Sequence, residues 1–181
     1  MLRRPALVAL AIALVVPLAA CTEATRIPDA EPSSELAPLF ASDEEALAAA
    51  TAAYEEFLAV LDAALEEPSI EKADLERVSG GQALSSASES IRQFSDEGLR
   101  ISGPRAIGSA QLQQHSSDQD GAEVTAYFCE DITDVLLLDA DGASLTQPDR
   151  PDYSVFEATI EFTNYGGRVV ERDFWSNESS C

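Results

Sequence analysis

The chain has 181 residues, of which 45% are apolar, and its 33 acidic residues against 11 basic ones give a formal net charge of −22. The length and the apolar fraction suit one domain with a single core. The negative field repels phosphate backbones and anionic lipid headgroups, which argues against nucleic-acid binding and against a polybasic membrane contact. It would attract cations or a basic partner, although solubility or adaptation to salt explains the same charge.

Residues 1–20 have the pattern of a secretory signal peptide. Arg3 and Arg4 precede an uncharged apolar run over 5–20, which is too short and wrongly flanked for a membrane span. Residues 18–21, Leu-Ala-Ala-Cys, resemble the lipobox of bacterial lipoproteins, in which the cysteine receives a diacylglyceryl group and becomes the first residue after cleavage. The resemblance implies that Cys21 anchors the protein on the extracytoplasmic face of the cell membrane. An ordinary signal peptide with a chance cysteine and an uncleaved anchor helix are the alternatives.

Residues 21–41 predict a flexible tether between the membrane and the folded part. Pro28, Pro32 and Pro38 stand among Ser, Glu and Asp residues with little periodicity, a composition that does not build a packed element. The folded domain is therefore predicted to span residues 42–181.

The domain is predicted to open with a long helix. Ser42 and Glu45 have the spacing of a capping box, and Pro68 ends the helix after about Glu67. Apolar residues recur at steps of three and four, which places one apolar stripe along the helix. The stripe consists of Leu47, Tyr54, Leu58, Leu61 and Leu65.

Two further helices are predicted before any strand. Ser69 is a candidate cap for a short helix that ends at Gly80 and Gly81. A third helix is predicted over residues 82–97, where Gly98 stands at the position of a left-handed C-terminal cap.

After Gly98 the apolar period falls toward 2, which predicts strands. Val124, Ala126 and Phe128 share one face of a predicted strand, and Tyr127 and Cys129 share the other. Helices followed by antiparallel strands predict an α+β domain with the helices on one face of a strongly curved sheet. Gly103 and Pro104 interrupt the first extended segment, which predicts a bulge or bend there and not one straight strand. The extended segments are predicted at 100–107, 110–115, 123–130, 134–138, 143–146, 153–163 and 168–175.

The order of elements resembles the cone-shaped fold of the nuclear transport factor 2-like superfamily, which includes polyketide cyclases and ketosteroid isomerases. Residues 126–131, Ala-Tyr-Phe-Cys-Glu-Asp, together with Trp175 and Cys181, resemble small secreted or lipid-anchored proteins of actinobacterial type that carry this fold. The likeness covers residues 42–181. It implies a pocket for a small apolar molecule between the first helix and the concave face of the sheet.

The three cysteines fit an oxidising compartment. If Cys21 carries lipid, Cys129 and Cys181 remain as an even pair, and we predict a disulfide between them. Two free thiols are the alternative.

Enzymes of the resembling superfamily use an Asp, Glu or His in the pocket as general base and a Tyr or a protonated acid as oxyanion donor. The alternation of the strands does not decide which face is concave, so no catalytic residue is assigned, and solvent-facing charges are the other reading of these side chains. The candidates are Glu157, Glu161, Glu171, Asp173 and Tyr127.

Metal and cofactor sites are not expected. His115 is the only histidine and is predicted to be a polar surface residue, and with no spare cysteine the chain has no ordinary zinc set. The segments 118–121 and 139–142 start like calcium loops but lack the later ligands, so turns explain both.

The sequence favours a noncatalytic, lipid-anchored envelope protein that binds a partner protein or a small ligand. An isomerase- or cyclase-like enzyme with a pocket carboxylate is the first alternative. A structural accessory lipoprotein whose cone is filled with side chains is the second.

Overall fold

A computed structural model describes residues 39–68, 74–118 and 120–176, all within the compact unit Leu36–Cys181. The predicted signal peptide, the lipidation site Cys21 and the tether up to residue 38 lie outside the described residues, as do Ser69 and Cys181. No helix of the described part is long and apolar enough to cross a membrane.

The first helix begins as its capping box predicts. Helix α1 spans Asp43–Glu66. The Ser42 hydroxyl accepts a hydrogen bond from the Glu45 backbone N–H, and the Glu45 carboxylate accepts one from the Ala41 N–H, at 3.2 and 2.8 Å. These reciprocal bonds satisfy amide groups that the helix itself leaves unpaired. The stripe that α1 buries consists of Ala46, Ala50, Tyr54, Phe57, Leu58, Leu61, Ala64 and Leu65.

The two later helices are shorter, and the structure confirms the prediction that Gly98 caps the C-terminal end of the last helix. Helix α2 spans Leu75–Val78 and helix α3 spans Gly81–Glu97. Gly98 follows α3 with a φ of 68°, in the left-handed region that favours glycine at this position.

Within the residues that the structure describes, six strands form two antiparallel sheets. The large sheet has the order β2-β3-β5-β6, with β2 at Ala106–Ser117, β3 at Ala122–Asp131, β5 at Tyr153–Thr163 and β6 at Gly166–Ser176. The small sheet pairs β1 at Arg100–Ser102 with β4 at Leu136–Leu138.

The predicted interruption at Gly103 is confirmed, whereas one predicted strand differs from the structure. Gly103 separates β1 from β2, has a φ of 97°, and its missing Cβ would lie 2.1 Å from the Asp134 carbonyl oxygen. A side chain has no room there, so the chain turns. The predicted strand 143–146 is reduced to one bridge between Leu138 and Ser144, because the Asp139 side chain binds the amide of Ala143 and closes a turn instead.

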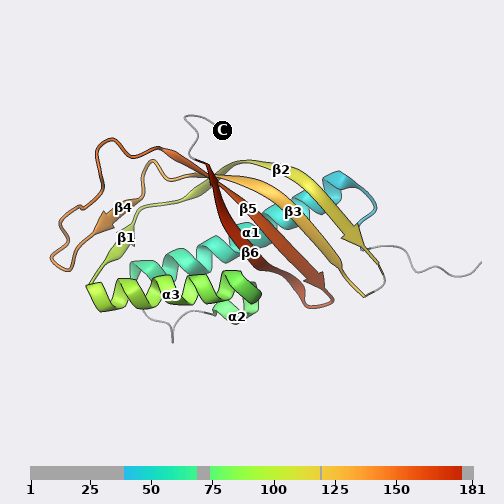
Figure 1. Cartoon of the computed structure of the whole chain (residues 1–181), viewed down its shortest axis with the longest axis horizontal. Coiled ribbons are helices and arrows are strands. Elements are labelled where there is room, and N and C mark those ends of the chain that lie inside the picture. The colour runs from blue at the N-terminus through green and yellow to red at the C-terminus, as the bar shows by residue number, and fades with distance from the viewer. Residues whose placement is uncertain (1–38, 69–73, 119, 177–181) are drawn as a thin grey trace, which may run out of the picture. The chain divides into compact units, whose positions relative to one another are not determined.

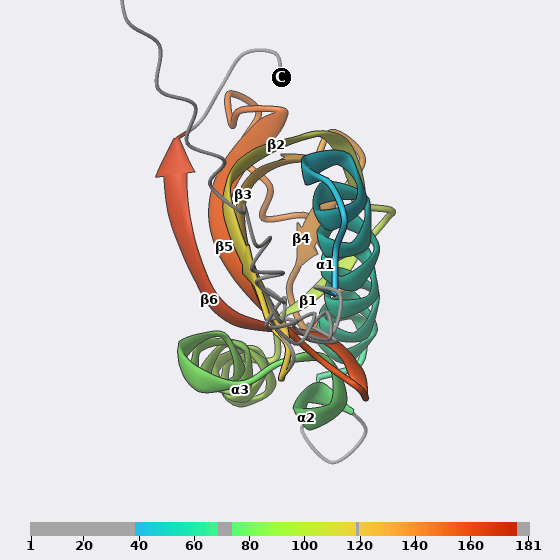
Figure 2. The same ribbon diagram turned by 90° about the vertical axis from the view of Figure 1, so that its right-hand side faces the viewer.

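The sheet curves around α1, which confirms the predicted α+β class with a cone-like sheet. Figure 1 places α1 behind the large sheet, and Figure 2 shows the sheet bending around it. The Tyr54 ring stacks on Phe128 of β3 with ring centroids 4.1 Å apart. Tyr54, Phe57 and Phe128 are all almost fully buried, so side chains fill the space between the helix and the sheet.

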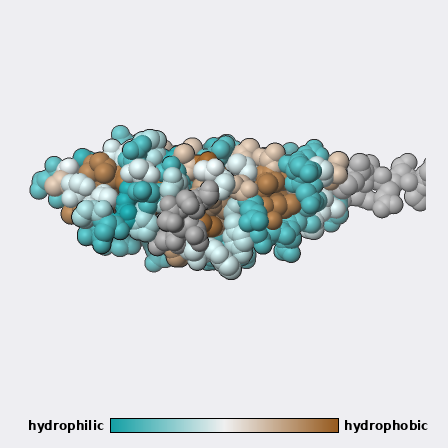
Figure 3. Space-filling view, turned by 90° about the horizontal axis from the view of Figure 1, so that it is seen from above, coloured by the Kyte–Doolittle hydropathy of each residue, from teal (hydrophilic) through white to brown (hydrophobic). Residues whose placement is uncertain are grey.

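The outer edge of β6 is covered by the chain between α2 and α3. The Gly80 N–H donates to the Val169 carbonyl at 2.9 Å, and the Gln82 side chain accepts from the Arg172 N–H at 2.9 Å. Gly81 has a φ of 49°, and a Cβ there would lie 2.8 Å from the Val170 carbonyl oxygen. A glycine is therefore needed for this close approach, which leaves less of the edge open to another strand. Seen from above, the surface is mostly hydrophilic with separate apolar patches (Figure 3).

Candidate functional site

Glu130 at the end of β3 is a buried carboxylate with a hydrogen-bond donor on both oxygens. Its side chain is 1% exposed. Oε1 accepts from the Tyr54 hydroxyl at 2.6 Å and from Arg172 Nη2 at 2.6 Å, and Oε2 accepts from Arg105 Nη1 at 2.9 Å. Charged groups are almost never fully buried unless they are paired in this way.

The partners of Glu130 are themselves joined. Arg172 Nε donates to the Tyr54 oxygen at 2.7 Å, and Arg105 Nη2 lies 2.7 Å from Asp62 Oδ1. We call these five residues the Glu130 cluster. Two guanidinium groups face two carboxylates, so the formal charges of the cluster cancel. Because Tyr54 and Asp62 belong to α1, the cluster ties that helix to β3, to β6 and to the residue just before β2.

The cluster sets the protonation state of its acids. Burial by itself would raise the pKa of Glu130, but attraction to Arg172 and Arg105 and the hydrogen bonds from Tyr54 and Arg172 lower it. Burial raises the pKa of the Tyr54 hydroxyl far above its ordinary value. Burial also raises the pKa of Asp62, against the opposing pull of Arg105. Glu130 is therefore an ionised acceptor and Tyr54 a neutral donor at pH 7.

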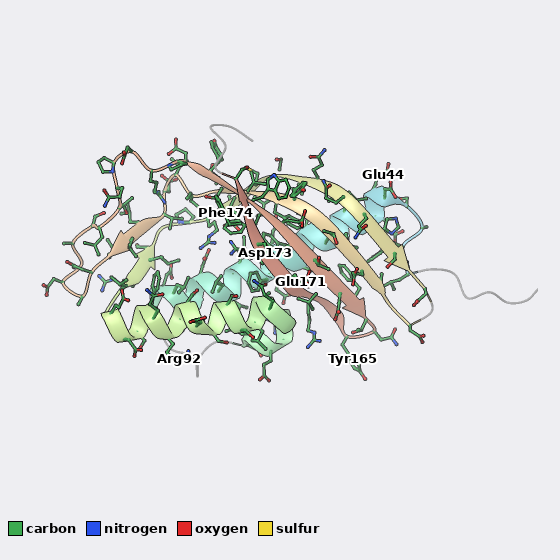
Figure 4. The ribbon with its side chains drawn as sticks, in the orientation of Figure 1. Glu44, Arg92, Tyr165, Glu171, Asp173 and Phe174 are labelled. Carbon is green, nitrogen blue, oxygen red and sulfur yellow. The ribbon has the colours of Figure 1, made fainter. Side chains whose placement is uncertain are left out.

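The opposite face of the large sheet, which we call the open face, is turned away from α1. Its side chains alternate with those of the core along every strand. Residues paired across the four strands form one row of this face, and the row consists of Gln111, Tyr127, Glu157 and Asp173. Figure 4 labels Glu171 and Asp173 on β6, in front of the sheet as seen by the viewer.

An aromatic pair lies beside this row. The Trp175 ring is 4.9 Å from the Tyr127 ring, measured between centroids, and Trp175 is 60% exposed. The pKa of the Tyr127 hydroxyl is raised, first by desolvation and then by its hydrogen bond and charge interaction with Glu157. Tyr127 and the carboxylate of Glu157 therefore act as one polar unit next to an exposed indole ring.

A hollow of about 490 Å³ continues the open face toward the start of α3. Thr125 and Thr159, whose hydroxyl groups are 3.2 Å apart, belong to its lining. Its charged lining residues are Glu123, Glu161, Glu171 and Arg168, so negative charge exceeds positive charge.

The catalytic candidates of the sequence lie on the open face and not beside Glu130. Glu157, Glu161, Glu171, Asp173 and Tyr127 all project from the face opposite α1, as their register positions require. The structure therefore separates these carboxylates from the concave side, where an enzyme of the resembling superfamily would hold its base.

Glu130 is not among the candidate residues that the sequence predicts. The period-2 pattern that places Val124, Ala126 and Phe128 on one face also places Glu130 there, and this signal was available. Its partners Arg105 and Arg172 carry no local signal, because their positions beside Glu130 depend on the folded sheet.

The remaining predicted residues lie elsewhere. His115 is half-buried, not fully on the surface, and its Nε2 lies 3.0 Å from Asp43 Oδ1 at the start of α1. Cys129 is buried, and because Cys181 lies outside the described residues, their disulfide stays a prediction.

The two calcium-like segments are turns. Asp118 Oδ1 accepts from the backbone N–H groups of Asp120 and Gly121, and Asp139 Oδ1 accepts from those of Asp141 and Ala143. Within the three described ranges, no group of three or more His, Cys, Asp or Glu residues is placed to hold a metal ion.

Comparison with known proteins identifies no family. No family model matches the chain, and no curated protein matches it. Among solved structures, the chain is similar to the intermembrane space region of the chloroplast protein ARC6, with 13% sequence identity and a TM-score of 0.49, over 72% of this chain and 96% of that one. A likeness this distant carries no argument about function.

Proposed function

We propose that this protein is a noncatalytic binding protein of the cell envelope, anchored by lipid on Cys21, and that its partner is another protein. The Leu-Ala-Ala-Cys pattern after an apolar run supports the anchor. The resemblance to actinobacterial lipoproteins with a nuclear transport factor 2-like domain is part of the same proposal. The two acyl chains of a diacylglyceryl group would hold the domain stably on the membrane, whereas a single chain would bind only marginally.

The proposal that the protein is noncatalytic rests on the burial of Glu130 and on its pairing with Tyr54, Arg105 and Arg172. A general base needs a lone pair directed at the substrate and a pKa near the working pH. Glu130 instead accepts three hydrogen bonds from the protein itself, and its pKa is lowered. The arrangement of a carboxylate beside a tyrosine thus serves the packing of α1 on the sheet. This argues against the isomerase-like alternative.

The filled interior favours a protein partner over a small ligand held in the cone. Tyr54, Phe57 and Phe128 occupy the space between α1 and the sheet. A filled interior also suits a purely structural lipoprotein. The exposed Trp175 beside Tyr127 favours binding over that role, since tryptophan and tyrosine are enriched in protein interfaces.

A photo-crosslinking residue at Gln111 should capture a partner. Gln111 is exposed on the open face, in the same row as Tyr127 and Glu157. Ala52 is exposed on α1 and serves as the control position. With the lipidated chain in its own membrane, we expect an adduct of discrete mass from Gln111 and none from Ala52. The measurement is immunoblotting of irradiated membranes. Equal adducts from both positions, or none from Gln111, would contradict the proposal.

The substitution Cys21→Ser should abolish acylation and leave the protein as an uncleaved precursor that its apolar signal segment holds in the membrane. It removes the thiol that would receive the diacylglyceryl group, so the acyl mass should disappear and the signal peptide should stay uncleaved. Fractionation with intact-mass measurement tests both outcomes, and Cys129→Ser, which leaves Cys21 in place, is the control. Normal acylation of the Cys21→Ser protein would overturn the anchor.

A further inference from the structure

We propose that the open face binds a lysine- or arginine-rich segment of the partner protein, with its cationic side chains placed on the Tyr127 and Trp175 rings and between Glu157 and Asp173. This inference rests on the proposed function and specifies the chemistry of the partner. It joins two observations, an exposed aromatic pair and two paired carboxylates. Tyr127 belongs to the row of Glu157 and Asp173, and Trp175 packs against Tyr127.

The geometry suits a cation. Glu157 is paired with Tyr127 on one side and with Asp173 on the other, so two carboxylates lie beside the aromatic pair. A lysine or arginine head group is attracted to the face of an indole or phenol ring within about 6 Å, while carboxylates accept its hydrogen bonds. An apolar partner would use the rings but would remove water from both carboxylates, whose hydrogen bonds with Tyr127 and Gln82 involve neutral groups only.

The open face also carries like charges in directly opposed positions. Glu157 is the cross-strand partner of Asp173, and Glu123 is the partner of Glu161. Like charges in such positions destabilise a sheet. Glu161 is also paired with Arg168 on β6, whereas the cross-strand partners of Glu157 and Asp173 include no basic residue. A cationic partner would reduce the repulsion between Glu157 and Asp173. Binding would then explain why an unfavourable pair is present on this face.

Other occupants fit less well. A second copy of the chain bound through the same face would bring two acidic surfaces together, and an anionic lipid surface would be repelled for the same reason. Charge complementarity therefore selects a basic protein segment.

The test uses the lipidated full chain in neutral phosphatidylcholine vesicles and a dye-labelled decalysine peptide, followed by fluorescence anisotropy. We expect saturable binding that weakens with salt, and no binding of a decaglutamate peptide. The double variant Glu157→Gln/Asp173→Asn should weaken binding about tenfold, which corresponds to roughly 1.4 kcal/mol. Trp175→Leu, which keeps apolar area but removes the ring face, should weaken it by about two- to fivefold.

A matched control separates this site from the general acidic field. Glu44→Gln/Glu55→Gln removes the same charge from exposed positions on α1, on the other side of the sheet (Figures 1 and 4). It should change the affinity by less than about twofold, since distant exposed charges are screened by salt. Equal weakening by both double variants, or binding of decaglutamate, would overturn the proposal.

Thermal unfolding without peptide gives an independent readout. Glu157→Gln/Asp173→Asn should raise the unfolding temperature because it removes an opposed pair of like charges, whereas a structural role for these residues predicts a lower one.

If the unsubstituted protein does not bind decalysine but still forms the Gln111 adduct, the cationic partner is overturned and the proposed function stands. Decalysine binding without any Gln111 adduct would count against the proposed function.

Discussion

Glu130→Gln should lower the free energy of unfolding at pH 7 by about 3–5 kcal/mol, the usual cost of removing one partner of a buried ion pair. The amide keeps the size of the side chain but removes the charge that faces Arg105 and Arg172. Both arginine side chains are largely buried, at 11% and 17% exposure, so water compensates them poorly. The NH₂ group of the glutamine would also take the place of an oxygen that accepts a hydrogen bond, so two donors would face each other.

Urea unfolding of the purified domain measures this effect, and Glu171→Gln is the matched control. Glu171 is exposed on the open face, and surface substitutions of this kind change stability by about 0.5 kcal/mol or less. If the two variants were equally stable, the Glu130 cluster would have no structural role, and the case against a catalytic Glu130 would weaken with it.

The same variant should alter the response to acid. The folded-state pKa of Glu130 is lowered, so its contribution to stability is present above the unfolded pKa of about 4.3 and is lost as the pH falls through the folded value. The wild type should therefore lose more stability on acidification than Glu130→Gln does.

Asp62 contributes to the pH dependence of stability in the opposite sense. Its pKa is raised, so its contribution is present at low pH and is lost as the pH rises through its folded value.

Phe128→Ala is expected to lower the free energy of unfolding by about 3–5 kcal/mol. Phe128 is fully buried at 0% exposure, and its ring stacks on Tyr54 at 4.1 Å. Truncation leaves a cavity directly against Tyr54. Because Tyr54 donates to Glu130 and accepts from Arg172, the cavity should also loosen the Glu130 cluster.

Phe174→Ala removes the same ring from a position that is 56% exposed and serves as the control for Phe128→Ala. Its cost should stay below about 1 kcal/mol, since less apolar surface leaves water there on folding. Denaturant unfolding of both variants measures the difference. A Phe128→Ala protein as stable as Phe174→Ala would mean that this ring pair is not part of the core.

Local chemistry made much of the fold predictable. The start of α1 depends on Ser42 and Glu45, and the end of α3 depends on Gly98, so each boundary is decided within a few residues. The extended segments 153–163 and 168–175, which form β5 and most of β6, were predicted from alternation, which is local as well. Where a local signal met a long-range constraint, the prediction failed. Gly80 and Gly81 were predicted to end the short helix, but they lie against Val169 and Val170 of β6, and Gly81 begins α3.

The sequence by itself therefore determined the α+β class, the start of α1, the end of α3 and the net negative charge, because composition, capping and alternation act over short stretches of chain. Only the tertiary structure decided which face of the sheet is covered by α1. That choice buried Glu130 with Arg105 and Arg172, which are 25 and 42 residues away. It also left Tyr127, Glu157 and Trp175 together on the open face. Contacts over such distances depend on how whole strands register and curve, and no short pattern in the chain encodes them.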